Sequence, residues 1–172
     1  MDDALSYRDR LPLHWTPLAA FPAGVEADRM AESNARLLTV VEMLGDHPQP
    51  GDDPNPTELE LQRIHQKLNL LLDLFGTFLS TQARRPPAVP VRLSWRSVAW
   101  AGDLPAGSTG LVELYLSPVL PQPLRLPATI AAGSAPGEAC AEFAAMPEFC
   151  QTALERHVFQ RHRREIAEKQ KR

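Results

Sequence analysis

Arginines gather in the middle of the chain, where they offer the clearest chemistry in the sequence. Arg84 and Arg85 are adjacent, and Arg92 and Arg96 follow closely. A guanidinium group is planar and always charged, so it binds phosphate or carboxylate oxygens through paired hydrogen bonds. This spacing predicts a basic patch with a weak anion-binding site.

The sequence lacks the motifs of common catalytic sites. It contains no G-x-S-x-G, P-loop, G-x-G-x-x-G or H-E-x-x-H motif, and GSTG at 107–110 and GSAPG at 133–137 have the wrong order of residues. Cys150, His157 and His162 share one side of a predicted helix only loosely, and three residues on one helix do not make a structural zinc site. We expect no enzymatic activity and no bound metal.

The C-terminal end is basic, whereas the first third of the chain is acidic. The basic residues of this end are Arg156, Arg161, Arg163, Arg164, Lys169, Lys171 and Arg172. Glu155, Glu165 and Glu168 are interleaved with them, and only Phe159 is available for base stacking. Because the whole chain has a formal net charge of −3, a solvated helix end is favoured over a nucleic-acid interface.

Composition indicates the class and the compartment of the protein. Its 172 residues suit one domain with an appended element. No apolar run approaches the roughly 20 residues of a membrane span. The first residues are charged and lack the apolar core of a secretory signal, so Cys140 and Cys150 are expected to be free thiols. We therefore expect a cytoplasmic protein without a membrane span.

The strongest helical signal lies within residues 57–82, where apolar side chains recur at alternating spacings of three and four residues. These positions are Leu61, Ile64, Leu68, Leu71, Phe75 and Phe78. The stripe is wider than that of a two-stranded coiled coil, because Leu72, Leu74 and Leu79 flank it. It predicts a bundle of three or four helices, and a core-facing helix of a globular domain is the alternative.

A similar pattern predicts a helix over residues 25–44. Its seam positions are Ala27, Met30, Asn34, Leu37, Val41 and Leu44. Asn34 either fixes the register of the helices or faces a wet helix end, and both interpretations remain open. A Pro-rich loop over residues 46–56 separates this helix from the next. We therefore expect an antiparallel hairpin over residues 25–83 that serves oligomerisation.

Short alternating segments follow the helices and indicate strands. Apolar and polar residues alternate from Val91 to Trp95, and a change of parity near Ser97 predicts a bulge or a tight bend. Further strands are expected within residues 111–116, 124–130 and 138–143. A short extended piece is expected around Pro12, which would confine it to a sheet edge. Pro147 suits the first turn of a C-terminal helix.

These segments predict an α+β fold, in which a small antiparallel β-barrel follows a long helical hairpin with heptad repeats and precedes a C-terminal helix. The expected parts are residues 1–24, an extended segment packed on the barrel; 25–83, the hairpin; 84–146, the barrel; and 147–172, the C-terminal helix with its basic tail.

The order of these parts resembles the PilZ domain, a family of bacterial receptors for the second messenger cyclic di-GMP. The stretches that carry the resemblance are VRLSWRSVAW, GLVELYLSP, PLRLPATI and LERHVFQRHR. The helical segment, with NARLL and QKLNLLLDLFGTFLS, resembles the atypical tetrameric branch of the family. In that branch, inserted heptad helices assemble four chains into a bundle.

A ligand-binding PilZ domain carries an R-x-x-x-R motif on the segment that enters the barrel and a [D/N]-x-S-x-x-G motif on a following strand, and this chain departs from both at those places. No arginine lies four residues beyond Arg84 or Arg85. In the second motif Arg92 stands at the acidic position, Ser94 at the serine and Ser97 at the glycine. The charge is thus reversed, and a side chain stands where close backbone approach is needed. The resemblance therefore implies weak or no cyclic di-GMP binding through Arg84, Arg85, Arg92 and Ser94.

The resemblance also implies a role and partners. It implies an oligomeric interaction module, tetrameric by preference, which regulates motility, surface behaviour or virulence through a protein partner that the sequence does not name. The alternative is a working cyclic di-GMP receptor that uses a non-standard set of arginines. A third hypothesis, independent of the family, is a nucleic-acid binder on an oligomeric scaffold. No other cofactor is implied.

Overall fold

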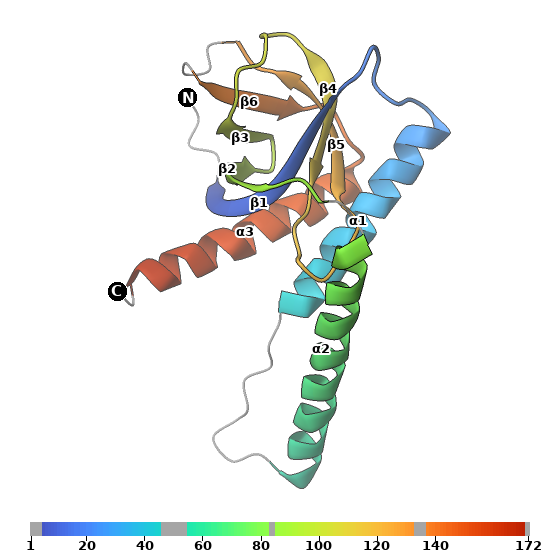
Figure 1. Ribbon diagram of the computed structural model, residues 1–172, viewed down its shortest axis with the longest axis vertical. Helices are drawn as coiled ribbons and strands as arrows, with labels where there is room; N and C mark the ends of the chain where they lie inside the picture. The colour runs from blue at the N-terminus through green and yellow to red at the C-terminus, as the bar shows by residue number, and fades with distance from the viewer. Residues whose placement is uncertain (1–4, 46–54, 83–84, 133–136, 171–172) are drawn as a thin grey trace.

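The computed structural model describes residues 5–45, 55–82, 85–132 and 137–170, which form six strands and three helices. These elements are β1 (Ser6–Pro17), α1 (Val25–Gly45), α2 (Pro56–Gln82), β2 (Ala88–Ser94), β3 (Ser97–Ala101), β4 (Thr109–Leu114), β5 (Leu124–Ile130), β6 (Glu138–Phe143) and α3 (Glu148–Gln170). The strands close into an antiparallel barrel in the order β1-β2-β3-β6-β5-β4, which confirms the predicted α+β class (Figure 1).

The long strand β1 closes the barrel. Its residues 6–12 pair with β2, whereas residues 13–17 pair with β4. Pro12 stands where the strand leaves one neighbour for the other, so its missing N–H group removes no bond from the middle of a ladder. The segment before the helices is therefore a strand of the barrel. The sequence predicted an extended segment packed on the barrel, with Pro12 at a sheet edge; residues 6–17 are extended but form part of the barrel itself, and Pro12 lies within β1.

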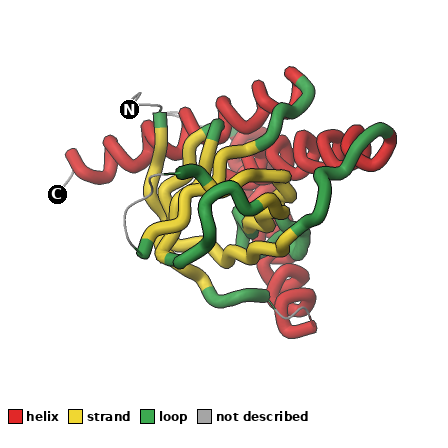
Figure 2. Tube along the Cα trace, turned by 90° about the horizontal axis from the view of Figure 1, so that it is seen from above, coloured by secondary structure: helices red, strands yellow, loops and turns green. Residues whose placement is uncertain are grey.

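Alternate residues of the strands fill the barrel. Val112 and Leu114 on β4 are fully buried, as is Leu124 at the start of β5. This alternation follows from the pleat, which points successive side chains to opposite faces. Leu154 and Val158 of α3 belong to the same cluster, so the core continues from the barrel to the helix beneath it. Seen from above, the strands form one group with the helices beside and behind it (Figure 2).

Helix α1 packs against α3 and β5. Leu37 and Leu38 belong to the core that it shares with the barrel. Buried Asn34 donates from Nδ2 to the Arg125 carbonyl at 2.6 Å and accepts from the Arg125 N–H at 3.0 Å. Asn34 therefore neither fixes the register of a helix seam nor faces a wet helix end. Its amide instead satisfies the backbone N–H and C=O groups of Arg125 on β5. The sequence also predicted that α1 and α2 pack together as a hairpin. Among the described residues, the structure does not show this packing.

The α1 positions assigned to oligomerisation thus have an intramolecular role. Asn34 and Leu37 are buried within the single chain, and Val41 packs against the core cluster. Met30 and Leu44 are half-buried. Heptad spacing specifies an apolar face but not which surface covers it, and here α3 and the barrel cover the face of α1.

Helix α3 is joined to the start of β1 by polar contacts. The Tyr7 hydroxyl and His157 Nε2 lie 3.1 Å apart, and both residues are buried. Arg161 pairs with Asp9 at 2.6 Å and lies over the Tyr7 ring. The next residue, His162, binds the Ser6 carbonyl, and Glu165, one turn beyond Arg161, accepts from the Arg8 N–H. These side chains satisfy backbone groups of β1 on the side away from β2.

Several basic residues near the C-terminus therefore have partners within the chain. Arg156 pairs with Glu42 on α1, and Arg164 donates to the Gly45 carbonyl at the end of that helix. A cation at a helix C-terminus is favourable because the carbonyls there carry partial negative charge. The prediction of a solvated helix end is therefore wrong for Arg161, His162, Arg164 and Glu165, which contact β1 or α1.

Helix α2 projects away from the barrel (Figure 1), and the side chains of its apolar stripe are exposed. The exposed fractions are 51% for Leu61, 55% for Ile64, 53% for Leu68, 62% for Leu71, 60% for Phe75 and 58% for Phe78. Leu72 is half-buried. None of the helices in the described ranges is both long and apolar enough to cross a membrane. The stripe that the heptad pattern predicts is thus present on α2, and no other helix or strand among the described residues packs extensively against it.

The contact between Asn34 and β5 gives a direct test of how α1 is held. Asn34→Leu should lower the free energy of unfolding by about 2–4 kcal/mol, since it leaves the N–H and C=O of Arg125 without partners. Urea denaturation measures this loss. Ser33→Ala, at the exposed neighbouring position, should change stability by less than about 0.5 kcal/mol. Equal midpoints for the two variants would contradict the assigned role of Asn34.

The pair of Tyr7 and His157 predicts how stability depends on pH. Burial, aided by nearby Arg161, lowers the pKa of His157 from 6.5 to about 4. The folded protein therefore binds fewer protons than the unfolded chain between these values, and stability is lost as pH falls from about 6.5 towards 4. The complete loss is about 3 kcal/mol. Urea midpoints across this window measure it.

A matched double variant tests the assignment of that pH dependence. Tyr7→Phe with His157→Leu replaces the polar pair by apolar side chains, which removes the titrating imidazole and leaves no unpaired hydroxyl. The slope of stability against pH between 6.5 and 4 should become much flatter than in the wild type. An unchanged slope would show that other groups produce it.

Candidate ligand-binding surface

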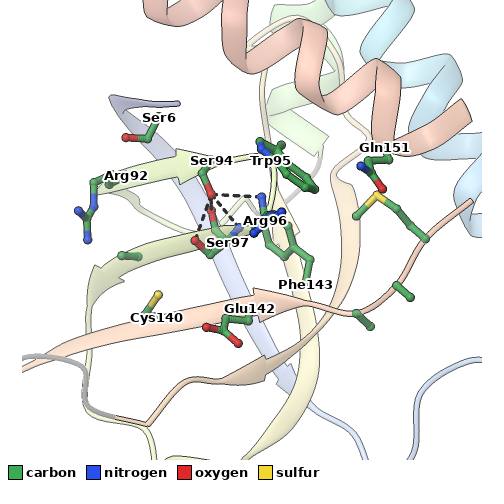
Figure 3. Close-up of a pocket in the computed structure, with 14 residues that line it drawn as sticks. Ser6, Arg92, Ser94, Trp95, Arg96, Ser97, Cys140, Glu142, Phe143 and Gln151 are labelled. Carbon is green, nitrogen blue, oxygen red and sulfur yellow. Dashed lines mark hydrogen bonds between the residues drawn. The ribbon is translucent and has the colours of Figure 1, made fainter. Parts of the chain in front are cut away.

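The candidate surface lies on the outside of the barrel, where β2, β3 and β6 lie side by side. A depression of about 540 Å³ opens there (Figure 3). Its polar and aromatic lining consists of Ser6, Arg92, Ser94, Trp95, Arg96, Ser97, Glu142, Phe143 and Gln151. Ala99 and Cys140 lie directly opposite each other in the register of β3 and β6 and form a floor of small side chains. The site is an open surface supported by a rigid sheet.

Arg92 and Ser94 are the predicted ligand residues that line this surface, and Arg92 is the charged one. It is exposed, and the register of β1 and β2 places Arg8 directly opposite it. A second depression, of about 550 Å³, is lined by both arginines. Like charges at directly opposed positions destabilise a strand pair. With the residues that the structure describes, neither guanidinium makes an ion pair, so both are available to an anion.

Arg8 was missed by reasoning from the sequence. It lies far from Arg92 along the chain, and only the pairing of β1 with β2 brings the two together. A signal in the sequence that could have indicated a basic strand here was the pair Arg8 and Arg10 beside the alternating apolar residues that follow. Arg10 is engaged differently, because its guanidinium donates to the Ala88 carbonyl at 3.2 Å.

Ser94 has a structural task in the turn between β2 and β3. Its hydroxyl oxygen accepts from the N–H groups of Arg96 and Ser97, at 3.1 and 2.9 Å, and lies 3.1 Å from the Ser97 carbonyl (Figure 3). Serine hydroxyls commonly stabilise turns in this way. The predicted tight bend near Ser97 is therefore present, and the Ser94 hydroxyl that was assigned to a ligand is used by the backbone.

The other two predicted ligand residues do not join Arg92. Arg84 lies outside the described residues. The Arg85 guanidinium donates to the carbonyls of Pro118 at 2.9 Å and Leu120 at 2.8 Å, and it lies over the Tyr115 ring. Carbonyls are acceptors that match these donors. Arg85 therefore ties together two segments of the chain and is not part of the depression around Arg92.

The electrostatics of the surface are mixed. Arg96 lies over the Trp95 ring, with its guanidinium carbon 4.3 Å from the ring centroid. Glu142 faces the first depression and Glu138 the second, so carboxylates oppose the arginines across the floor. Burial raises the pKa of the Cys140 thiol, which disfavours the reactive thiolate. The arrangement suits weak recognition of a charged group.

The described residues offer neither a metal site nor paired catalytic groups on this surface. No group of three His, Cys, Asp or Glu side chains is placed to hold a metal ion within those ranges. His157 and His162, which share a helix with Cys150, are bound to Tyr7 and to the Ser6 carbonyl respectively. These histidines therefore serve the docking of α3.

The predicted oligomerisation residues separate into two groups. Those on α2 form one exposed stripe, whereas those on α1 face α3 and the barrel of the same chain. Spacing along the sequence was identical for both helices, so it carried no signal of this difference. The exposed α2 stripe is therefore a candidate interaction surface beside the depressions on the barrel.

Comparisons with known proteins agree with this geometry. Residues 35–172 match the family model described as "Atypical PilZ domain, cyclic di-GMP receptor". A solved structure of a pathogenic protein from Xanthomonas campestris, described as a tetrameric PilZ domain self-assembled via an unusual helical bundle, is similar to this chain with 30% identity and a TM-score of 0.70. The match covers 96% of this chain and 92% of that one. No curated protein sequence matches. The resemblance seen in the sequence is thus confirmed, and the chain belongs to the atypical PilZ family.

Proposed function

We propose that this protein is an oligomeric PilZ module that assembles through α2 and presents its barrels to a protein partner. The observation that carries the proposal is the stripe from Leu61 to Phe78, whose side chains are more than half exposed. Contiguous apolar surface of this kind marks an interaction site in a stable protein. Its spacing of three and four residues fits another helix with the same pattern.

A second copy of the chain is the partner that this stripe fits best. The similar Xanthomonas structure is described as a tetramer held by a helical bundle, and it aligns with almost the whole of this chain. The stripe on α2 is also wide, since Leu74 is 60% exposed beside the seam. A wide stripe contacts two neighbouring helices at once, which favours four helices over two.

Nucleotide binding is proposed to be weak or absent. Arg92 stands where the family motif has an acid or an amide, the Ser94 hydroxyl is used by its own turn, and Arg85 is bound to backbone carbonyls. The carboxylate of Glu142 also faces the depression and repels phosphate oxygens. The barrel then acts as a surface for protein contacts within cyclic di-GMP-related regulation.

One observation favours the alternative of a working cyclic di-GMP receptor. Arg8 and Arg92 are exposed and directly opposed on β1 and β2, without an ion pair to any described carboxylate. Two such guanidiniums are able to hold phosphate oxygens together. A receptor of this kind would use arginines from two strands in place of the family motif.

The cellular role follows from the family and not from the site. Regulation of motility, surface behaviour or virulence in a bacterium is the role that the family implies, and the cytoplasm is the compartment proposed for it. The arrangement of the described residues supports binding in preference to catalysis. Arg156, Arg161 and Arg164 have partners within the chain, which argues against the hypothesis of a nucleic-acid binder.

Assembly is tested by placing charges on the α2 stripe. Leu68→Asp with Phe75→Asp should give monomers of 19.1 kDa by light scattering, because carboxylates at seam positions are not compatible with a buried interface. Gln66→Asp with Asn69→Asp adds the same charge at other exposed positions of α2 and should keep the wild-type mass. A stripe variant with the wild-type mass would contradict assembly through these residues.

Nucleotide binding is tested by calorimetric titration of the folded oligomer with cyclic di-GMP. The proposed function predicts no saturable heat. If binding is saturable, Arg92→Ala should abolish it, whereas Arg10→Ala should leave it nearly unchanged, because Arg10 is bound to the Ala88 carbonyl. That pattern would contradict the proposed function and establish the receptor alternative.

A further inference from the structure

The loop between β4 and β5, residues 115–123, touches α2 at one glycine. We call this segment the seat loop. A Cβ atom placed on Gly76 would lie 2.6 Å from Val119 Cα and 2.9 Å from the Val119 carbonyl oxygen. Backbone atoms cannot move aside as the end of a side chain can, so this approach requires glycine at position 76. Gly76 is buried, although the residues around it on α2 that can be described are mostly exposed.

Arg85 holds the seat loop from the other side. Its guanidinium donates to the carbonyls of Pro118 and Leu120, and more weakly to that of Ser117 at 3.4 Å. It also lies over the Tyr115 ring at 5.6 Å. Only a rigid fork of donors spans several carbonyls at once, and lysine has no equivalent geometry. Arg85 follows α2 closely in the chain, so the helix and the loop are tied at two points.

The contact at Gly76 lies near the barrel end of α2, and the free end of the helix is far from it. The helix between Pro56 and Gly76 is about 30 Å long at its usual rise per residue. A tilt of about 10° at the contact therefore moves the free end by about 5 Å, by the same geometry. Heptad side chains of two helices interdigitate best near preferred crossing angles. A small change of angle at Gly76 therefore causes a large displacement of the side chains at the assembly surface.

We propose that the seat loop sets the angle at which α2 leaves the barrel, through the close approach at Gly76 and the carbonyl contacts of Arg85. This angle determines how the barrels are placed around the assembled helices. The inference rests on the proposed assembly through α2 but concerns a different part of the protein. It also gives Arg85 a role as a positioning residue for the assembly helix.

Gly76→Ala tests this role, because the proposal and its alternative predict opposite effects on assembly. Alanine is the better helix former, so a merely tolerated glycine predicts a more stable α2 and unchanged or tighter assembly. The proposed role of the seat loop predicts weaker assembly, because the added methyl group pushes α2 away from the loop. The concentration at which the oligomer half dissociates, measured by light scattering, should rise roughly tenfold or more. Asn69→Ala, at an exposed position of the same helix, should not raise it.

The angle is measured separately from assembly in the monomeric background of Leu68→Asp with Phe75→Asp. Small-angle X-ray scattering should show a changed radius of gyration when Gly76→Ala is added, and the same change for Arg85→Lys, but no change for Asn69→Ala. Near-ultraviolet circular dichroism of the barrel tryptophans should be retained in all of these variants. If Gly76→Ala matches Asn69→Ala in both the dissociation of the oligomer and the radius of gyration, the proposed role of the seat loop is wrong. A monomeric wild type would instead contradict the proposed assembly.

Discussion

The constraint on which the structure depends is that the barrel closes through one long strand and leaves strand edges that other elements must cover. At the start of β1 the free backbone groups of Ser6 and Arg8 are satisfied by His162 and Glu165 of α3. Along β5, the amide of Asn34 on α1 satisfies both groups of Arg125. Unpaired strand edges are costly and prone to aggregation, so α1 and α3 are committed to the protomer.

This commitment leaves the apolar stripe of α2 uncovered by its own chain, apart from the contact at Gly76. The proposed assembly follows from this exposure, because four such helices would cover each other's stripes, and the similar Xanthomonas structure is described as a tetramer held by a helical bundle. The barrel is free to keep an open face, where Arg8 and Arg92 stand opposite each other above a floor of small residues. In the proposed function, α2 thus serves assembly and the open face of the barrel serves recognition.

The sequence predicted the elements well and their partners poorly. Apolar periodicity located α1, α2 and the strands from β4 to β6, because periods of 3.6 and 2 follow directly from local geometry. It did not distinguish α1 from α2, since a heptad pattern records only that a face is covered. Ser94 was assigned to a ligand because it stands at the serine of the family motif, and Arg85 because it belongs to the cluster of arginines, yet each is used by nearby backbone groups. Arg8 could not be found without the register of β1 and β2.

Amide hydrogen exchange of the wild-type oligomer and of its monomeric variant Leu68→Asp with Phe75→Asp tests the central claim most directly. The claim is that α1 and α3 are packed within the protomer, whereas the apolar stripe of α2 is covered only by other copies of the chain. It predicts that α2 amides are protected in the oligomer and lose most of this protection in the variant, while those of α1 and α3 stay protected in both. Equal protection of α2 in the two samples, or loss of protection in α1 together with α2, would contradict the account.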